Sequence, residues 1–407
     1  MAIKLDFNKA YDRVEWDFLL ELMRRMGFAP KWIQWVSECI TTVIFSVFVN
    51  REKQAAFTLS HGLRQGDPLS LYLFILVADV LSKLITHNLH RGQLSGFKIN
   101  RHSPTLSHLL FADDVLLFLK EDQSECLKIL DILSSYCIAT GQLVNFDKSS
   151  VQFSLNVSFP LRGSIRQLSG FRETPVNAKY LGLPTFWRRS KAEAYDFIIE
   201  RVQAKLQGWK LKLLSHIGQE TLIKVVVQAI PSYAMACFIF PKNFCAKLNS
   251  LISKFWWNGD PESKGIHWVN WAQLAMPKSE GGLGFRDFHD FNLALVAKQG
   301  WRLVKYPNSF CAKMLKGIYF SHSNFMEASR GRCVSWAWAS LIQSRKILCN
   351  GVRWQVYNGA SINFWDDKWI PSLPGFKVSS PKPPISRVSA VVDIIDATHG
   401  IWKVEDL

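Results

Sequence analysis

The segment Leu109-Leu110-Phe111-Ala112-Asp113-Asp114-Val115-Leu116-Leu117-Phe118 places two acidic residues between two strongly apolar runs. These runs predict two strands that fold back on each other at the Asp113-Asp114 pair. An Asp-Asp pair at a turn usually serves only to stabilise the turn, through hydrogen bonds from the backbone to the side chains. Here the apolar runs on both sides predict that the hairpin is buried, and buried carboxylates need cations to offset the cost of desolvation.

A third carboxylate, Asp6, lies at the end of the first predicted strand, residues 1–7. From Ala10 to Gly27 the apolar residues recur at helical spacing. Asp6, Asp113 and Asp114 form an oxygen-only donor set, which suits Mg²⁺ completed by substrate phosphates. Two such ions about 3.5–4 Å apart stabilise the attacking and leaving oxygens of an in-line phosphoryl displacement.

Charge and tryptophan are unevenly divided along the 407 residues. The chain carries 49 Lys and Arg against 33 Asp and Glu, a net charge of +16. Residues 1–150 hold 16 basic and 16 acidic side chains, whereas residues 151–407 hold 33 and 17, together with 13 of the 16 tryptophans. This pattern predicts a neutral front domain and a basic, aromatic-rich second part with an anionic partner.

Composition excludes several classes of protein. An apolar fraction of 48% excludes a mainly disordered chain, and none of the eight cysteines forms a C-x-x-C pair, which excludes a disulfide framework or a zinc knuckle. The start shows no charged leader before an apolar run. The apolar stretch 222–241 is interrupted by Lys224 and Pro231, so a buried helix is expected there and no membrane span. The expectation is an intracellular protein.

The periodicity of the chain predicts further elements. Strands are expected at 45–50 and 57–59, and Asp67 or Ser70 is placed to cap an apolar helix over 70–90. Helices are also expected at 124–140, 192–214, 219–230, 244–256 and 291–305. The Trp-rich segment 331–371 is expected to hold short strands, and the Pro- and Ser-rich segment after it reads as a linker.

Three stretches resemble motifs A, B and C of polymerases: Lys4-Leu5-Asp6-Phe7-Asn8-Lys9-Ala10-Tyr11-Asp12, Gly62-Leu63-Arg64-Gln65-Gly66-Asp67-Pro68-Leu69-Ser70 and Phe111-Ala112-Asp113-Asp114. Their order and spacing are similar to those of reverse transcriptases of non-LTR (LINE-type) retrotransposons. Residues 141–149 resemble motif D, and Tyr180-Leu181-Gly182 resembles the primer-grip turn. The stretches 281–285, 292–295 and 298–302 are similar to the thumb and connecting region of plant members. The resemblance covers roughly residues 1–370.

The resemblance implies roles around the incoming nucleotide. Asp6 and Asp113 would bind both metal ions, with Asp114 beside them and the Phe7 carbonyl as a backbone ligand. Tyr11 would lie under the incoming sugar, where an aromatic ring excludes a 2′-hydroxyl; the alternative is a core tyrosine at a helix start. The residues assigned to the nucleotide and template side are Arg64, Gln65 and Gly66.

The resemblance also implies roles for more distant residues. Lys148 would protonate the leaving pyrophosphate, and a solvated lysine near a turn is the alternative. Tyr180, Leu181 and Gly182 would form the primer grip. A predicted basic helical stretch would contact duplex phosphates; the alternative is a solvated helix face. The residues assigned to this contact are Arg188, Arg189, Lys205 and Lys210, and the same stretch also contains Lys191, Arg201 and Lys212.

The implied fold is α+β: a right-hand polymerase palm with an antiparallel sheet backed by helices, then a mainly helical thumb and a Trp-rich α+β extension. The expected domains are a palm at 1–155, a primer-grip turn and helical thumb or connection at 156–305, the extension at 306–371, and a linker and truncated tail at 372–407. The resemblance begins at motif A, so an N-terminally truncated fragment without fingers is expected. His61, Arg51 and Leu71 depart from the family pattern.

The implied function is that of an RNA-directed DNA polymerase, which adds dNTPs to a primer 3′-hydroxyl with two Mg²⁺ ions, or Mn²⁺ as a substitute. Its partners would be an RNA template and a DNA primer, and the resemblance implies action in the nucleus. The alternative is a catalytically inactive retrotransposon remnant that only binds nucleic acid. A two-metal nuclease is a poorer alternative, because the carboxylates lie within polymerase motifs. Template choice, integration site and oligomeric state are not predicted.

Overall fold

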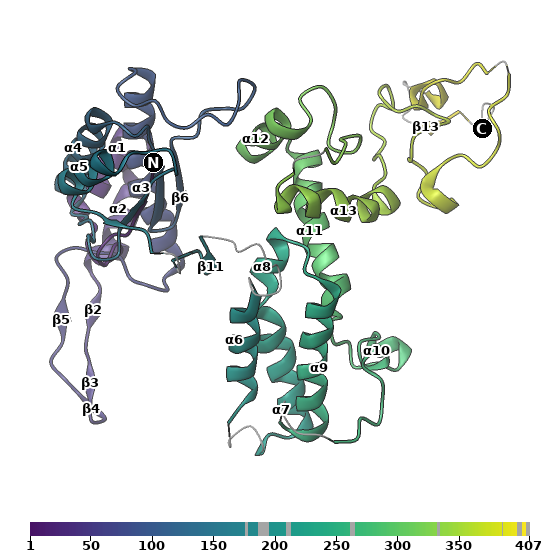
Figure 1. Ribbon diagram of the computed structural model, residues 1–407, viewed down its shortest axis with the longest axis horizontal. Coiled ribbons are helices and arrows are strands. Elements are labelled where there is room, and N and C mark those ends of the chain that lie inside the picture. Colours follow the sequence, from purple (N-terminus) through teal and green to yellow (C-terminus); the bar gives the residue numbers. More distant parts are fainter. Residues whose placement is uncertain are drawn as a thin grey trace. The chain divides into compact units, whose positions relative to one another are not determined.

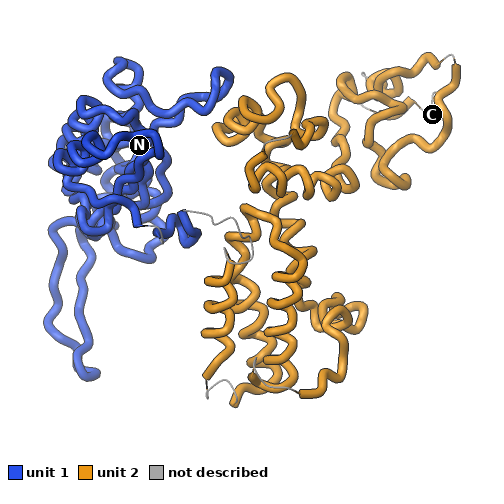
Figure 2. The backbone as a smooth tube through the Cα atoms, in the orientation of Figure 1, with its two compact units in different colours: residues 1–187 blue, residues 188–407 orange. Residues whose placement is uncertain are grey.

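The computed structural model describes residues 1–175, 178–185, 195–208, 213–260, 265–331, 334–384, 386–396 and 401–403. The chain divides into two compact units, Met1–Trp187 and Arg188–Leu407 (Figure 2). Hydrophobic cores lie within each unit. The first unit therefore includes the segment 156–185, which the sequence assigned to the region after the palm.

The first unit mixes short strands with longer helices (Figure 1). Its elements are β1 (Ala2–Leu5), α1 (Trp16–Arg25), α2 (Pro30–Thr41), β2 (Ile44–Phe45), β3 (Phe48–Val49), β4 (Glu52–Lys53), β5 (Phe57–Thr58), α3 (Pro68–His90), β6 (His108–Phe111), β7 (Asp114–Phe118), α4 (Gln123–Thr140), β8 (Ser150–Gln152), α5 (Phe159–Ser169), β9 (Arg172–Glu173), β10 (Lys179–Tyr180) and β11 (Leu183–Pro184).

A five-stranded sheet in the order β6-β7-β1-β8-β9 is the centre of the first unit. All neighbours are antiparallel except β8 and β9. Alternate residues of a strand point to opposite faces, so Ile3 and Leu5 of β1 are fully buried while Lys4 and Asp6 lie on the other face. The expected α+β palm with an antiparallel sheet is confirmed.

Helices cover the buried face of this sheet. The core contains Val77 and Leu81 of α3 and Ile129 of α4, together with Ile3 and Leu5 of β1. α3 is long and apolar enough to cross a membrane by length and composition alone. A share of 33% of its apolar window is buried inside the structure, including Val77 and Leu81 in this core.

The first helix begins later than its periodicity predicted, at Trp16 instead of Ala10. The backbone carbonyls of residues 10–14 accept tertiary hydrogen bonds in place of helical ones: Leu63 N–H donates to the Tyr11 carbonyl at 2.8 Å, and Gly62 N–H donates to the Val14 carbonyl at 2.8 Å. The expected cap of the long helix is confirmed, because the Asp67 side chain accepts a hydrogen bond from Leu69 N–H at 2.9 Å.

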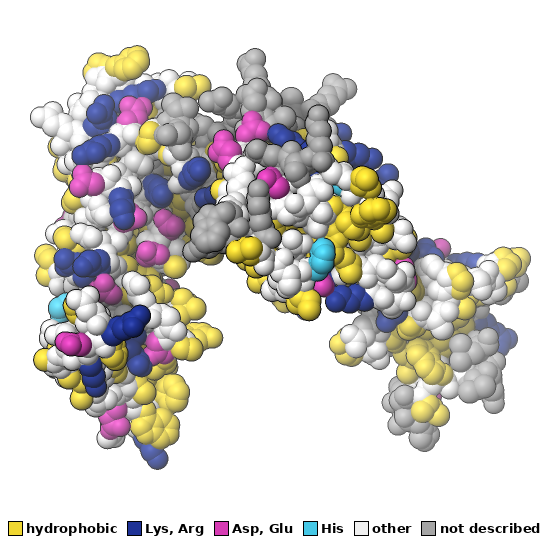
Figure 3. All heavy atoms as spheres, turned by 90° about the horizontal axis from the view of Figure 1, so that it is seen from below, with side chains coloured by type: hydrophobic (Ala, Val, Ile, Leu, Met, Phe, Trp, Pro, Cys, Tyr) yellow, Lys and Arg dark blue, Asp and Glu magenta, His cyan; other side chains and the backbone are white. Residues whose placement is uncertain are grey.

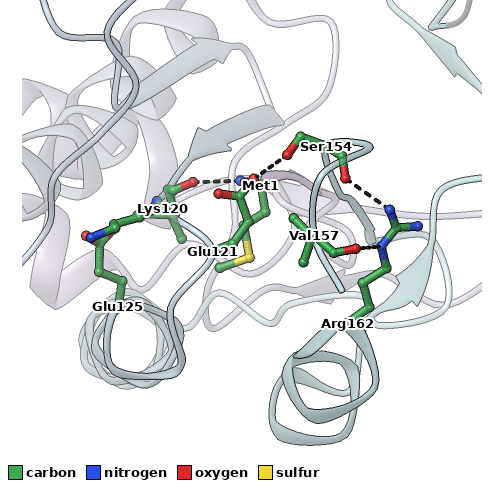
Figure 4. A network of polar contacts seen from close by, with 8 residues as sticks. Met1, Lys120, Glu121, Glu125, Ser154, Val157 and Arg162 are labelled. Carbon is green, nitrogen blue, oxygen red and sulfur yellow. Dashed lines mark hydrogen bonds and ion pairs between the residues drawn. The ribbon is translucent and has the colours of Figure 1, made fainter. Parts of the chain in front are cut away.

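Polar contacts tie the end of β7 to the loop before α5 (Figure 4). Ser154 Oγ donates to the Glu121 carboxylate at 3.0 Å, and the Arg162 guanidinium donates to the Ser154 and Val157 carbonyls, each at 3.0 Å. Glu125 is buried and accepts Lys120 N–H at 3.1 Å. These bonds connect the segments that follow β7 and β8 with each other and with the first turns of α4 and α5.

His108, at the start of β6, gives the first unit a pH-dependent stability. Burial lowers the pKa of His108, whose ring nitrogens lie 2.8 and 2.9 Å from the Ser82 and Ser107 hydroxyls. Because the unfolded chain protonates this imidazole more readily, stability is expected to fall as the pH drops below about 6.5. Hydrogen exchange of the β6–β7 amides should report weaker protection at pH 5.5 than at pH 7.5.

The control for this prediction compares two substitutions. His108→Gln should reduce the pH dependence of β6–β7 protection, because it removes the titrating group. His61→Gln, which alters an exposed histidine, should leave it unchanged. An equal pH dependence in the parent and His108→Gln would contradict the prediction.

The second unit is mainly helical. Its elements are α6 (Asp196–Leu206), α7 (His216–Thr221), a π-helical turn (Leu222–Val226), a 3₁₀ turn (Val227–Ala229), α8 (Ser232–Cys237), α9 (Lys242–Asn258), α10 (Trp271–Leu274), a 3₁₀ turn (Lys278–Glu280), α11 (Phe288–Lys305), α12 (Phe310–Tyr319), α13 (Trp336–Gly351), two further 3₁₀ turns (Pro374–Phe376 and Val391–Ile394), β12 (Ile395–Asp396) and β13 (Ile401–Trp402).

Two segments of the second unit differ from expectation. The Trp-rich segment contains the helix α13 instead of strands, because Ser335 caps it and Trp338 and Leu341 pack into a core with α11. The segment 372–407 was expected to be a linker and truncated tail, yet Val391 and Ile394 of the tail form a small core with Trp369 and neighbouring residues. The interior of this small core is built from both sides of the predicted boundary.

Asn292 is a fully buried polar residue that organises the second unit. Its amide nitrogen donates to the Met235 and Phe238 carbonyls, each at 2.8 Å, and its Oδ1 accepts Phe240 N–H at 2.7 Å. Asn292→Leu is expected to lower the free energy of unfolding by about 2 to 3 kcal/mol, because it removes three buried hydrogen bonds to backbone groups. Urea denaturation measures the change.

Asn308→Ala provides the matched control, because Asn308 is exposed in the same unit. This substitution is expected to change stability by less than about 0.5 kcal/mol. Equal stability of the Asn292→Leu and Asn308→Ala variants would contradict the role assigned to Asn292.

Candidate active site

The pairing of β1 with β7 brings the predicted aspartates together. Leu5 pairs with Val115 in antiparallel register, so the next residues along the two strands, Asp6 and Asp114, lie opposite each other. Phe111 pairs with Asp114 across a turn of only two residues, Ala112 and Asp113. The hairpin therefore presents Asp113 exposed to solvent beside the partly buried Asp114.

The electrostatics of Asp114 reflect this clustering. Burial raises the pKa of Asp114; the Lys4 ammonium opposes the shift, while the Asp113 and Asp6 carboxylates add to it. The mutual repulsion of three carboxylates is the condition under which a bound cation stabilises a site.

Lys4 also lies at this site, although the motif assignment gave it no role. It lies two residues before Asp6 on the same face of β1, and its ammonium donates to the Lys179 carbonyl at 3.1 Å. Lys4 thus links the five-stranded sheet to the hairpin of β10 and β11. The sequence signal that could have assigned Lys4 to the site is the alternation of side chains along a strand, which places Lys4 and Asp6 on one face.

The β10–β11 hairpin contains the residues assigned to the primer grip. Tyr180 pairs with Leu183 across a two-residue turn formed by Leu181 and Gly182. The φ values of these two residues are +49° and +80°, as a tight hairpin turn of this hand requires.

Tyr11 lies on a turn and its ring stacks on Phe74 of α3, with ring centroids 4.5 Å apart. Burial raises the pKa of Tyr11, and the Asp113 carboxylate adds to the shift. The Tyr11 side chain is therefore partly exposed, held from behind by Phe74, and within electrostatic reach of Asp113.

The loop before α3 packs closely on the turn that carries Tyr11. Gly62 has φ +93°, and a Cβ at this position would lie 2.6 Å from the Asp12 carbonyl oxygen, so only glycine allows this approach. Arg64 forms an ion pair with Asp67. Gln65 and Gly66 are exposed at the tip of the loop.

Residues 141–149 run alongside the end of β1. Phe7 forms an antiparallel bridge with Val144, flanked by hydrogen bonds from Asn8 N–H to the Leu143 carbonyl and from Asn145 N–H to the Asp6 carbonyl, each 2.8 Å. The Phe7 carbonyl receives no hydrogen bond from the residues that the structure describes. Lys148 is exposed.

Several predicted nucleic-acid residues cannot be placed with this site. Arg188, Arg189 and Lys210 lie outside the described residues, as do Lys191 and Lys212. Lys205 is exposed on α6 of the second unit. Figure 3 shows basic and acidic side chains interspersed over the first unit, in keeping with the balanced charge of residues 1–150.

The donor chemistry fits a hard cation such as Mg²⁺, because the clustered groups are carboxylates and one free backbone carbonyl. Within the described residues, no group of three or more His, Cys, Asp or Glu side chains is placed to hold a metal ion by itself. Mg²⁺ commonly takes one or two carboxylates and completes its shell with water and substrate phosphates. The carboxylates of the site would therefore supply only part of such a shell.

Comparisons with known proteins bear on the same residues. The model of the family described as reverse transcriptase (RNA-dependent DNA polymerase) matches residues 1–185. An uncharacterized mitochondrial protein of Arabidopsis thaliana is 39% identical over 159 residues, which are 39% of this chain and 99% of that protein.

Two further similarities extend over more of the chain. A retrovirus-related Pol polyprotein from the type-1 retrotransposable element R2 of Popillia japonica is 26% identical over 222 residues, 52% of this chain; the chain spans only 35% of that relative. A telomerase structure from Candida tropicalis in complex with a fragment of telomeric RNA has a TM-score of 0.34 and 13% identity, covering 78% of this chain and 48% of that one.

Proposed function

The chain belongs to the reverse transcriptase family, among proteins of non-LTR retrotransposons, and from this premise we propose that its first unit catalyses RNA-directed DNA synthesis. The reaction would add dNTPs to the 3′-hydroxyl of a DNA primer on an RNA template. The observation that carries the proposal is the placement of Asp6 opposite Asp114, with Asp113 in the adjoining turn.

Asp6, Asp113 and the Phe7 carbonyl would hold two Mg²⁺ ions, with Asp114 beside them. When bound, the ions would stabilise charge on the attacking and leaving oxygens of the phosphoryl transfer. Mn²⁺ shares the preference for oxygen ligands and would serve as a substitute. The raised pKa of Asp114 supports this assignment, because burial, with a smaller contribution from the Asp113 and Asp6 carboxylates, destabilises its ionised form, and a bound cation would compensate.

Residues around the aspartates would position the substrates. Tyr11, held by Phe74, would contact the sugar of the incoming dNTP, and Gln65 and Gly66 at the exposed loop tip would face the nucleotide and template. Arg64 would act there through its ion pair with Asp67, which fixes the start of α3.

The remaining assignments concern the primer and the leaving group. The turn Tyr180-Leu181-Gly182 would hold the primer end, and its link to the catalytic sheet through Lys4 supports this role. Exposed Lys148 would donate a proton to pyrophosphate. Lys205, with Arg188, Arg189 and Lys210, would bind duplex phosphates.

Nucleic-acid binding without catalysis is the second candidate function. The observation that favours it is that no group of three or more His, Cys, Asp or Glu side chains among the described residues is placed to hold a metal ion. The two candidates differ in one measurable property, namely the extension of a primer.

The test is primer extension on an oligo(dT)-primed RNA template with Mg²⁺ and dNTPs. The full chain is compared with its Asp113→Ala/Asp114→Ala double variant, and duplex binding is measured for both. Extension by the parent alone is the expected result. No extension by the parent, with duplex binding retained in both proteins, would overturn the polymerase and leave the binding function.

A further inference from the structure

A basic cleft lies within the second unit, apart from the aspartates. Its volume is about 920 Å³, within the usual range for ligand sites. The walls come from the segment before α9, the start of α11, the segment around Arg330, and α13 (labels in Figure 1). No motif assigned to the polymerase reaction contributes to this cleft.

The charged side chains in the described lining of the cleft are positively charged. Four cationic side chains line it, namely Lys242, Arg330, Arg345 and Lys346, and none of its described lining residues is Asp or Glu. Lys242, Arg330 and Lys346 are exposed and form no ion pair with any described residue. Cations gathered in a hollow without counter-charges create a positive potential that attracts anions.

Arg345 has a different role in the wall. Its guanidinium donates to the Phe325 carbonyl at 3.1 Å and to the Ala328 carbonyl at 2.6 Å. These bonds fix the loop that leads to Arg330. Arg345 therefore shapes the cleft and adds charge, while the three exposed cations remain available to a ligand.

The floor of the cleft is held in place before any ligand arrives. Ile239 N–H donates to Ser340 Oγ at 2.9 Å, and Phe240 N–H donates to Asn292 Oδ1 at 2.7 Å. Both Ser340 and Asn292 are buried. A preformed site avoids the entropic cost of ordering its walls on binding.

Two further groups in the lining, His289 and Trp336, indicate which other contacts a ligand could make. His289 Nδ1 is buried and has no hydrogen-bond partner among the described residues, so the wall contains an unused polar atom. The ring of Trp336, which also lines the cleft, packs against Phe238 and Tyr195 with centroids 4.9 and 5.2 Å apart. An aromatic ring beside cations is the combination that single-stranded nucleic acids use, through base stacking and phosphate contacts.

We propose that this cleft binds single-stranded nucleic acid, with phosphates at Lys242, Arg330 and Lys346 and a base against Trp336. The choice of nucleic acid over other polyanions rests on the proposed function, whereas the anionic character of the ligand follows from the cleft itself. The cleft would hold a strand at a second point on the chain, independently of the aspartates.

The test measures binding of a fluorescent 12-nucleotide single-stranded RNA, and of DNA of the same sequence, to the full chain at several salt concentrations. The triple variant Lys242→Gln/Arg330→Gln/Lys346→Gln should bind one or both strands about 10- to 30-fold more weakly near 0.1 M salt. The slope of log affinity against log salt concentration should also become shallower, by about 0.7 for each phosphate that the variant no longer neutralises.

The matched control is Lys305→Gln/Lys313→Gln/Lys316→Gln, which removes three exposed cations of the same unit outside the cleft. Equal affinities of the two triple variants would overturn the proposal. Competition by ADP that is as strong as competition by the unlabelled 12-mer would also overturn it, in favour of a mononucleotide site.

A separate variant distinguishes this proposal from the polymerase. Asp113→Ala/Asp114→Ala should keep the binding that depends on the cleft, because these residues lie in the first unit. Failure of the parent to extend a primer, with cleft-dependent binding intact, would overturn only the polymerase. Extension by the parent, with no effect of the cleft variant on binding, would overturn only the cleft.

Discussion

Asp6→Asn is expected to reduce the rate of primer extension by on the order of 10³-fold or more, because it removes a full negative charge from a carboxylate assigned to both metal ions. The register of β1 and β7 places this carboxylate opposite Asp114. Asparagine keeps the size of the side chain and can still accept a hydrogen bond. Single-turnover extension on a primed RNA template measures the rate.

Asp131→Asn is the control for this prediction. Asp131 is exposed on α4, where it pairs only with Lys128 at 2.9 Å among the described residues. The rate of primer extension by Asp131→Asn should stay within about twofold of the parent's rate, because an exposed ion pair contributes little free energy. A tenfold or smaller loss in Asp6→Asn would contradict the assignment of Asp6 to the metal ions.

Tyr11→Val is expected to relax discrimination between dNTPs and rNTPs by on the order of 10²-fold, the scale at which pocket shape rejects an added hydroxyl. Tyr11 is held against Phe74 by ring stacking and lies within electrostatic reach of Asp113. Valine would open the space that the ring fills. The ratio of kcat/KM for dGTP to that for GTP, on a template cytosine, measures the effect.

Tyr11→Phe separates this role from simple packing, because phenylalanine keeps the ring and its stack on Phe74. Its discrimination ratio should match that of the parent. If Tyr11 is only a core residue, Tyr11→Val will lower stability and leave the ratio unchanged, and that outcome would contradict the steric role.

The local pattern of residue types in the sequence predicted most of the main elements of the first unit. The two apolar runs around Asp113 form the expected hairpin, residues 1–7 contain the expected strand, and Asp67 caps the expected helix. Each of these depends on interactions between residues close in sequence, such as side-chain alternation or a side chain capping its own helix. The candidate site could be assembled from the sequence because its residues lie in motifs of recognisable order.

Prediction was weaker where distant segments decide local structure. The first helix starts at Trp16 because residues 62 and 63 donate hydrogen bonds to carbonyls that a helix beginning at Ala10 would have used. Lys4 was missed because its partner, the Lys179 carbonyl, lies 175 residues away. Helical structure in the Trp-rich segment was missed because aromatic residues suit both strands and buried helices.

The amino-acid sequence alone predicts the candidate chemistry: three carboxylates in polymerase-like motifs, an apolar hairpin that presents two of them, and a basic second part. Which of these groups meet depends on the folded structure. It placed Asp6 opposite Asp114, set Tyr11 on Phe74, and gathered cations from separate segments into one cleft. The physical reason is that side-chain type and period are local properties, whereas register, burial and the field around a carboxylate depend on segments far apart in the chain.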